Sequence, residues 1–309
     1  MKKYLIFATI VAMVFVGCKK NTTAPPKKPA DNRVAAQLSG KILKDDVKTT
    51  TRVTYDGQWE GAEKIGIFML PSGSKEIATS FTNNSKFSCS KTGAMTPEGE
   101  KIYFPSNDTE VDFIAYHPHN TEFNSKNVGF LPTTPVNFSE QKDLTALEFL
   151  WSFVPKQSAK SPAIQFPFRR LQSSMQIVLV SNARYISDEV LKGTKITIEA
   201  IPVMATFDVM NGALINPKAP INLQLERNLV YLPPHTNENF SNRKIVVEMP
   251  YKGKTLSYIA PITFEMVAGK THKVTIKLGD ESGELSVSST IEPWWAGKRQ
   301  DDIHPVRIR

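Results

Sequence analysis

The sequence predicts an all-β protein built as β-sandwiches. From Val34 onward, short alternating or wholly apolar runs are broken by Gly, Pro, Asn, Asp and Ser, and the breaks recur about every ten residues. No amphipathic repeat lasts long enough to form a helical bundle. The 309 residues exceed one typical domain of roughly 100 to 200 residues, so two domains are expected.

The first 17 residues are expected to be a signal peptide. Met1, Lys2 and Lys3 form a short positive region, and residues 4–16 form an apolar run. This run is too short to span a bilayer, which needs about 20 apolar residues. Export is therefore expected, without a transmembrane anchor.

Cys18 is the predicted lipidation site. It follows the letters VFVG at residues 14–17, which resemble a bacterial lipobox, where cleavage precedes a cysteine that is then acylated. Several acyl chains, palmitate among them, would anchor the chain to the outer membrane. The alternative is an ordinary secretory signal that contains a cysteine by chance. Residues 18–32, which carry the cysteine and are rich in Pro and Lys, are expected to be a flexible tether.

The candidate strands follow from alternation and from apolar runs between turn residues. They are residues 34–43, 52–55, 64–69, 86–90, 101–104, 111–117, 175–180, 195–200, 205–209, 244–249, 255–261 and 272–278.

Connections between the strands predict where the domains divide. Short helical turns are expected at residues 144–149 and 187–192. The Ser-, Lys- and Pro-rich stretch before Phe168 predicts a boundary between an N-terminal β-sandwich domain, residues 33–163, and a C-terminal one, residues 164–309. The C-terminal domain is expected to carry a terminal strand extension.

The net charge of +8 comes mostly from the amino-terminal region. Residues 1–30 hold six lysines and no acidic residue, so the rest of the chain has 32 basic and 30 acidic side chains. No interior basic run is longer than the two residues of Arg169-Arg170. A nucleic-acid-binding domain concentrates basic residues on one face, so this class of partner is disfavoured.

No catalytic or cofactor motif is found, so we expect neither enzyme activity nor a cofactor. His117 and His119 form the only local histidine pair, but Pro118 separates them and no further ligand lies at a recognised spacing, so no metal site is expected. Besides Cys18 the chain holds only Cys89, which excludes an intramolecular disulfide in the mature body. A buried, unreactive thiol is the expected state of Cys89.

Seven short phrases stand in order along the body. They are TTRV at 50–53, WEGAEKIGIFM at 59–69, IYFPS at 102–106, VDFIAYHPH at 111–119, FPFRRL at 166–171, AGKTHKV at 268–274 and IEPW at 291–294. Together with the lipobox, they resemble the fimbrillin (Mfa-like) family, the lipoprotein precursors of type V pili in Gram-negative anaerobes. The sequence departs from the family pattern at Ala62-Glu63, at His117 and His119, and at Arg169, where the family usually has Gly-Asp, tyrosines and a histidine.

The resemblance implies two tandem transthyretin-like β-sandwich domains and assembly by strand exchange. In this family an arginine-specific protease cuts after the first strand, and a strand of another subunit fills the groove that opens. Cleavage between Arg52 and Val53 is the expectation here, because a cut at Arg33 would free only the tether. The alternative is that Arg52 is an ordinary surface residue.

The removable strand is expected at residues 34–43, with Val34, Leu38 and Ile42 on its buried face. Removing these three side chains from the core would cost roughly 5 to 9 kcal/mol, close to the net stability of a typical domain. Such a loss would drive the uptake of a replacement strand.

The candidate donor strand lies near the carboxyl terminus. Leu285, Val287, Ser289 and Ile291 alternate there, although this segment is nearly as compatible with a last strand of its own domain. A strand from another copy that enters the open groove would link the subunits into a fibre.

The predicted function is a structural pilin subunit of a cell-surface fimbria that supports adhesion and binds other pilin subunits, in a homo- or heteropolymer, and a host or bacterial surface ligand. Stalk, tip and anchor positions stay open, as does the leaflet that holds the lipid. The alternative function is a monomeric, surface-exposed glycan-binding lipoprotein that stacks sugars on Trp294 or Trp59. Cleavage after Arg52 would leave 27 basic and 27 acidic residues, so the excess charge would be discarded with the leader.

Overall fold

The computed structural model confirms the all-β prediction. It describes residues 33–43, 55–57, 59–74, 76–77, 81–106, 108–124, 129–130, 133–181, 193–226, 228–278 and 285–294. The helical element among these residues is a single 3₁₀ turn, η1 (Thr121–Asn124). Nowhere in these ranges is a helix long and apolar enough to cross a bilayer. Arg33–Arg309 form one compact unit.

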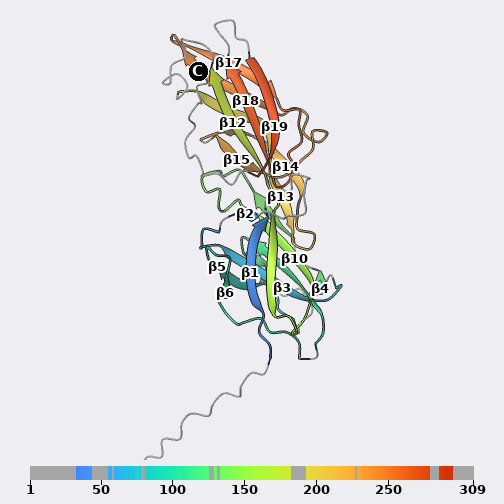
Figure 1. Ribbon diagram of the computed structural model, residues 1–309. Coiled ribbons are helices and arrows are strands. Elements are labelled where there is room, and N and C mark those ends of the chain that lie inside the picture. The colour runs from blue at the N-terminus through green and yellow to red at the C-terminus, as the bar shows by residue number, and fades with distance from the viewer. Residues whose placement is uncertain are drawn as a thin grey trace, which may run out of the picture. The chain divides into compact units, whose positions relative to one another are not determined.

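An eight-stranded sheet forms the lower group of strands in Figure 1. Its strands, in spatial order, are β2 (Tyr55–Gly57), β1 (Gln37–Leu43), β11 (Ala163–Arg170), β10 (Leu150–Gln157), β7 (Val111–His117), β3 (Lys64–Pro71), β5 (Ser85–Cys89) and β6 (Met95–Pro97). The strands β4 (Glu76–Ile77) and β8 (Gly129–Phe130) form a separate two-stranded sheet. The first strand of the chain is thus paired with the last strand of the sheet, β11.

Two further sheets form the upper group in Figure 1. A four-stranded sheet has the order β15 (Leu229–Leu232), β12 (Ser173–Ser181), β18 (Lys270–Leu278) and β19 (Leu285–Pro293). A five-stranded sheet has the order β14 (Ala213–Gln224), β13 (Lys195–Asp208), β16 (Lys244–Tyr251) and β17 (Lys254–Pro261), and β9 (Thr133–Asn137) pairs with β13. The chain thus leaves the eight-stranded sheet after β7, joins the five-stranded sheet through β9, and returns to the eight-stranded sheet at β10.

Strand β7 is buried on both faces and serves two hydrophobic cores. Because successive side chains of a strand point to opposite faces, Phe113 and Ala115 join the core enclosed by the eight-stranded sheet, while Ile114 and Tyr116 join the core of the other two sheets. Tyr116 packs against Phe207 of β13, with ring centroids 5.8 Å apart. The continuous burial of residues 111–117 therefore reflects two cores.

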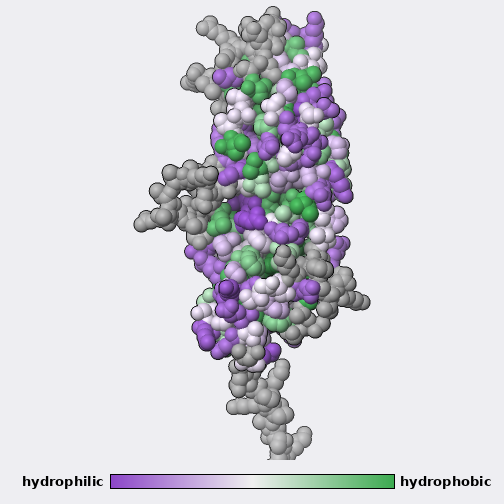
Figure 2. Space-filling view, turned by 90° about the vertical axis from the view of Figure 1, so that its right-hand side faces the viewer, coloured by the Kyte–Doolittle hydropathy of each residue, from purple (hydrophilic) through white to green (hydrophobic). Residues whose placement is uncertain are grey.

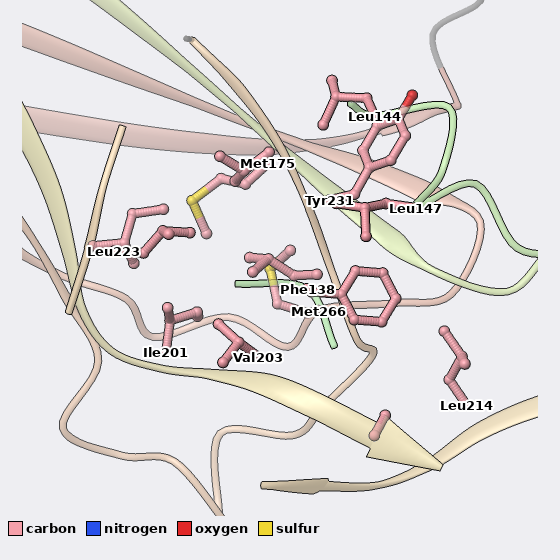
Figure 3. Packing of buried hydrophobic residues seen from close by; sticks show 14 of the residues in the cluster. Phe138, Leu144, Leu147, Met175, Ile201, Val203, Leu214, Leu223, Tyr231 and Met266 are labelled. Atoms are coloured by element: carbon pink, nitrogen blue, oxygen red, sulfur yellow. The ribbon is translucent and has the colours of Figure 1, made fainter. Parts of the chain in front are cut away.

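The larger core lies between the four- and five-stranded sheets. Figure 3 shows Ile201 and Val203 from β13 packed towards Met175 from β12 and Phe138. Phe138 and Leu144 come from the connection between β9 and β10, so this segment closes one side of the core. By contrast, the face in Figure 2 is mostly hydrophilic, and its hydrophobic residues are scattered in small patches.

Most expected strands are present, and the differences have local causes. Residues 195–200 and 205–209 belong mainly to one strand, β13, whose pairing with β14 is interrupted by irregularities. Residues 101–104 form no strand, because Tyr103 makes only an isolated bridge to Ala35. Residues 144–147 form turns instead of a helix, and strand β10 follows at Leu150.

The remaining expectations concern the division of the body. The helical turn at 187–192, the signal peptide, the tether and Cys18 lie outside the described residues. Strand β11 still belongs to the eight-stranded sheet, and β12 belongs to the next one. A division between Arg170 and Ser173 therefore follows the sheets more closely than the expected one at 163/164, and the number of domains stays a prediction.

Candidate functional site

Strand β1 fills a groove in the eight-stranded sheet. On one side it runs parallel to β11, with Gly40 opposite Phe166. On the other side residues 93–104 follow it, through isolated bridges from Ser39 to Ala94 and from Ala35 to Tyr103. We call the space between β11 and residues 93–104 the β1 groove.

Main-chain hydrogen bonds hold β1 on both sides of the β1 groove. The Gln37 N–H donates to the carbonyl of Pro162 at 2.8 Å, next to β11. On the opposite side, the N–H groups of Ala36 and Gly40 donate to the carbonyls of Ile102 and Gly93, at 2.9 and 2.8 Å. Main-chain hydrogen bonds of this kind contribute affinity for a strand of any sequence, while the side-chain pockets of a groove determine which side chains fit.

The buried face of β1 alternates as predicted, with one correction. Leu38, Gly40 and Ile42 are buried, while Gln37 and Lys41 are exposed. Val34 was expected on the same buried face, but 40% of it is exposed. It precedes the paired segment and holds its place through its carbonyl, which accepts from the Phe104 N–H. The groove therefore holds two large side chains of β1, and these are Leu38 and Ile42.

Gly40 occupies the tightest point of the β1 groove. A Cβ atom at this position would lie 2.7 Å from Cε of Met95 and 2.7 Å from Cε2 of Phe168. Its carbonyl accepts a buried hydrogen bond from Nε1 of Trp59 at 2.9 Å. The ring of Trp59 packs edge-on against the ring of Phe168, with 5.3 Å between the ring centroids. This arrangement was not predicted from the sequence, although a glycine inside a strand is a known sign of close backbone approach.

Gly93 shapes the same point from the opposite wall. Its φ is +84°, and a Cβ there would lie 2.1 Å from the Gly40 oxygen. Only glycine fits both conditions, because other L-residues are strained at this φ and the carbonyl leaves no space. Gly93 and Gly40 thus let the two backbones meet closely.

The candidate cleavage residues Arg52 and Val53 lie outside the described residues. The ends that flank them are described: β1 ends at Leu43 and β2 begins at Tyr55. Arg33, the other candidate, stands with its guanidinium 4.4 Å from the ring centroid of Tyr103. This cation–π contact packs Arg33 against the body at the start of the described chain.

The candidate donor strand is β19, an edge strand. It pairs antiparallel with β18 along its whole length, so its other edge is free of strand pairing in the described chain. Val287 is 40% exposed and Ile291 is 56% exposed, whereas the side chain of Leu285 lies outside the described residues. In this structure β19 is thus a strand of its own sheet that presents two apolar side chains to solvent.

Both tryptophans considered for sugar stacking are buried. Trp294 is 6% exposed, and it packs against Tyr231 and under the guanidinium of Arg170. Trp59 is 4% exposed and belongs to the β1 groove. Each indole is enclosed in a hydrophobic core, so neither presents a face to a glycan in this structure.

The remaining candidate groups are also placed by packing. Cys89 is buried, and burial raises the pKa of its thiol to about 12, so it stays protonated at neutral pH. His117 is buried and its pKa is lowered mainly by desolvation, while His119 lines a cavity of about 370 Å³ beside Lys64 and Lys86. Within the described ranges, no group of three or more His, Cys, Asp or Glu side chains is placed to hold a metal ion.

Comparison with known proteins agrees with this architecture. The model of a family described as fimbrillin-like matches residues 51–294. A Bacteroides uniformis protein, provisionally named fimbrium subunit Fim1C, is 25% identical over 315 residues, which cover 96% of each chain.

Solved structures share the fold. A crystal structure from Bacteroides uniformis, provisionally described as a cell adhesion protein, has a TM-score of 0.68 and 22% identity, over 87% of this chain and 100% of that one. A structure from Bacteroides ovatus with the same description has a TM-score of 0.64 and 13% identity, over 86% and 99% of the two chains.

Proposed function

The chain belongs to the fimbrillin-like family, and from this premise we propose that it is a structural subunit of a cell-surface fimbria that supports adhesion. Its curated relative is provisionally named a fimbrium subunit, and similar solved structures are provisionally described as cell adhesion proteins. In this proposal, cleavage between Arg52 and Val53 frees β1, and a strand of another subunit then takes its place.

The way in which β1 is held is the observation that carries this proposal. β1 is bonded on both sides in the β1 groove, and after a cut at Arg52 no peptide bond would link it to β2. Its departure would expose the partners of Leu38 and Ile42, at a cost of roughly 3 to 6 kcal/mol for two buried aliphatic side chains. It would also leave the carbonyls of Gly93, Ile102 and Pro162 without their donors. An emptied groove is therefore a strong acceptor for a new strand.

The anchor and the location complete the proposal. Acylation of Cys18 holds the exported precursor in the outer membrane, and the cut at Arg52 separates the subunit from this anchor. The partners are other pilin subunits and a surface ligand. Polymerisation needs no nucleotide or other cofactor, because burial of the new strand supplies the free energy.

Limited proteolysis tests the proposal. Treatment of the full chain with an arginine-specific protease should give a new amino terminus at Val53 and convert monomers to polymers. Arg52→Ala should block both results, and the matched variant Arg33→Ala should leave both unchanged. Polymers made by Arg52→Ala at the wild-type rate, or fibres whose subunits retain residues 34–43, would refute cleavage and strand exchange.

A further inference from the structure

A cavity of about 370 Å³ lies at the end of β7, beside His119. Two sheets supply its lining: Lys64 and Lys86 come from β3 and β5 of the eight-stranded sheet, and Val136 and Phe207 come from β9 and β13 of the five-stranded sheet. Sites for small ligands measure roughly 300 to 1,000 Å³, so this space suits one ring-sized group. We call it the β7–β9 cavity.

One part of the lining carries a net positive charge. The Nζ atoms of Lys64 and Lys86 bond to different oxygens of Glu98, Oε1 and Oε2, and the Lys86 contact is 2.9 Å long. Two cations thus share one carboxylate, and each ammonium group has three N–H donors, so both keep donors for another acceptor. The two ammonium groups already stand at a spacing that fits the two oxygens of one carboxylate. A second carboxylate, on a ligand, is therefore the anion that they suit.

The apolar part of the lining is rigid and aromatic. Phe149 and Phe207 are buried, and their ring centroids lie 5.7 Å apart. Val136 adds an aliphatic surface, and the hydroxyl-bearing side chains Thr121 and Thr134 also line the cavity. A sugar ring has C–H groups that pack on the negative faces of aromatic rings and hydroxyl groups that bond to polar side chains. This mixture of lining groups matches that chemistry.

His119 adds a polar atom that lacks a partner. Its Nε2 is buried and has no hydrogen bond within the part of the chain that the structure describes. Desolvation chiefly lowers the pKa of His119, so the ring is neutral at pH 7. A buried polar atom without a partner is costly, and a ligand hydroxyl group would supply the missing hydrogen bond.

We propose that the β7–β9 cavity binds a sugar ring that carries a carboxylate, such as a uronic acid residue of a surface polysaccharide. The carboxylate bonds to Lys64 and Lys86, the ring lies against Phe149 and Phe207, and a hydroxyl group bonds to His119. This inference rests on the proposed function and gives the chemical class of the surface ligand that an adhesive subunit would hold.

Paired sugars test the need for a carboxylate. Methyl glycosides of glucuronic and galacturonic acid are titrated into the full chain and followed by NMR, together with those of glucose and galactose. At least one acidic sugar should bind at millimolar concentrations, at least ten-fold more tightly than its neutral counterpart, and added salt should weaken its binding. Equal affinities within each pair, or no binding of either acid, would overturn the proposal.

A matched pair of lysine variants tests the location. Lys86→Gln should weaken binding of the acidic sugar at least five-fold. Lys244→Gln is the control, because Lys244 pairs with Glu199 at 3.0 Å and is 39% exposed, close to the 42% of Lys86, but does not line the cavity. Equal affinities of the two variants would overturn the site.

A bulky variant tests whether the cavity itself is used. Thr121→Trp, at an exposed position of η1, should fill the β7–β9 cavity and abolish binding, with urea denaturation as the check that the variant folds. Binding that persists in the folded variant would overturn the site.

Polymerisation separates this inference from the proposed function. The cavity lies outside the β1 groove, so cleaved Lys86→Gln should polymerise like wild type while it loses the sugar. If the cleaved wild-type chain forms no polymer but binds the acidic sugar, the fimbrial function fails and the sugar site stands. Polymers that bind no acidic sugar would overturn the site and leave the fimbrial function intact.

Discussion

The indole nitrogen of Trp59 donates a buried hydrogen bond of 2.9 Å to the carbonyl oxygen of Gly40. This bond joins a residue of the core to the main chain of β1, the strand that we propose to be exchanged. Since every amino acid has a main-chain carbonyl, Trp59 can bind the native strand and its replacement alike. Met95 and Phe168 separately limit the size of the side chain that fits at the position of Gly40.

Replacement of Trp59 by phenylalanine should loosen β1. Trp59→Phe leaves the buried Gly40 carbonyl without its indole donor, which costs about 1 to 3 kcal/mol. Trp151→Phe is a matched control, because the Trp151 Nε1 donates to the Val209 carbonyl, outside the β1 groove. After cleavage, the β1 peptide should leave Trp59→Phe at least five-fold faster than wild type, as measured by size-exclusion chromatography and mass spectrometry. Equal acceleration in both variants would contradict a specific role of Trp59.

Substitution of Gly93 should disturb the groove more than substitution of a comparable turn glycine. Gly93→Ala adds backbone strain and places Cβ 2.1 Å from the Gly40 oxygen. Gly73→Ala adds strain at a similar φ, +75°, but its Cβ meets nothing within 4 Å. Gly73→Ala should cost about 1 to 2 kcal/mol of unfolding free energy, and Gly93→Ala should cost more than this. Urea denaturation of both variants would reveal the difference, and equal losses would argue against the close contact.

Acid should destabilise the body through two buried histidines. The Nε2 atom of His235 accepts from Arg243 at 2.7 Å, and its Nδ1 is bonded to the Pro233 carbonyl. Burial chiefly, and the nearby Arg243, lower the pKa of His235 and of His272 to about 4, below about 6.5 in the unfolded chain. The neutral forms therefore favour the folded state above pH 6.5, and this contribution is lost as the pH falls from 6.5 towards 4.

Urea denaturation between pH 7.5 and pH 4.5 would measure this loss. Each histidine should contribute a slope of up to about 1.4 kcal/mol per pH unit. Glu265 also acts on Arg243, and carboxylates elsewhere titrate in this range, so the useful quantity is the difference between variants. His235→Gln, which can still accept from Arg243, should show a shallower slope than wild type. An unchanged slope would show that His235 is not buried in its neutral form.

Alternation and apolar runs predicted the fold class and most central strands, because those signals arise from burial within one strand. Strand β14 was not predicted, because it contains Pro217 and Pro220 and proline is unfavourable in most strands. β14 is an edge strand, where proline is tolerated. Its irregular pairing with β13 and the positive φ of Asn216 and Ala219 depend on the neighbouring strand.

The candidate site was predictable only in part. The alternation of Leu38 and Ile42 predicted their burial, but it also included Val34, which the fold leaves exposed. The Trp59 bond to Gly40 and the approach of Gly93 join segments far apart in the sequence. Such contacts give no periodic pattern in the sequence, so they follow only from the three-dimensional pairing of the strands.

Strand β7, whose alternate side chains enter two cores, has a mechanical consequence. Ile114 and Tyr116 belong to one core and Phe113 and Ala115 to the other, so β7 connects the two cores within a single strand. In a fimbria under tension, load entering at the β1 groove would pass through adjacent strands to β7, and from there through packed side chains to the sheet that holds β19. A subunit built in this way would stretch little before it failed as a whole.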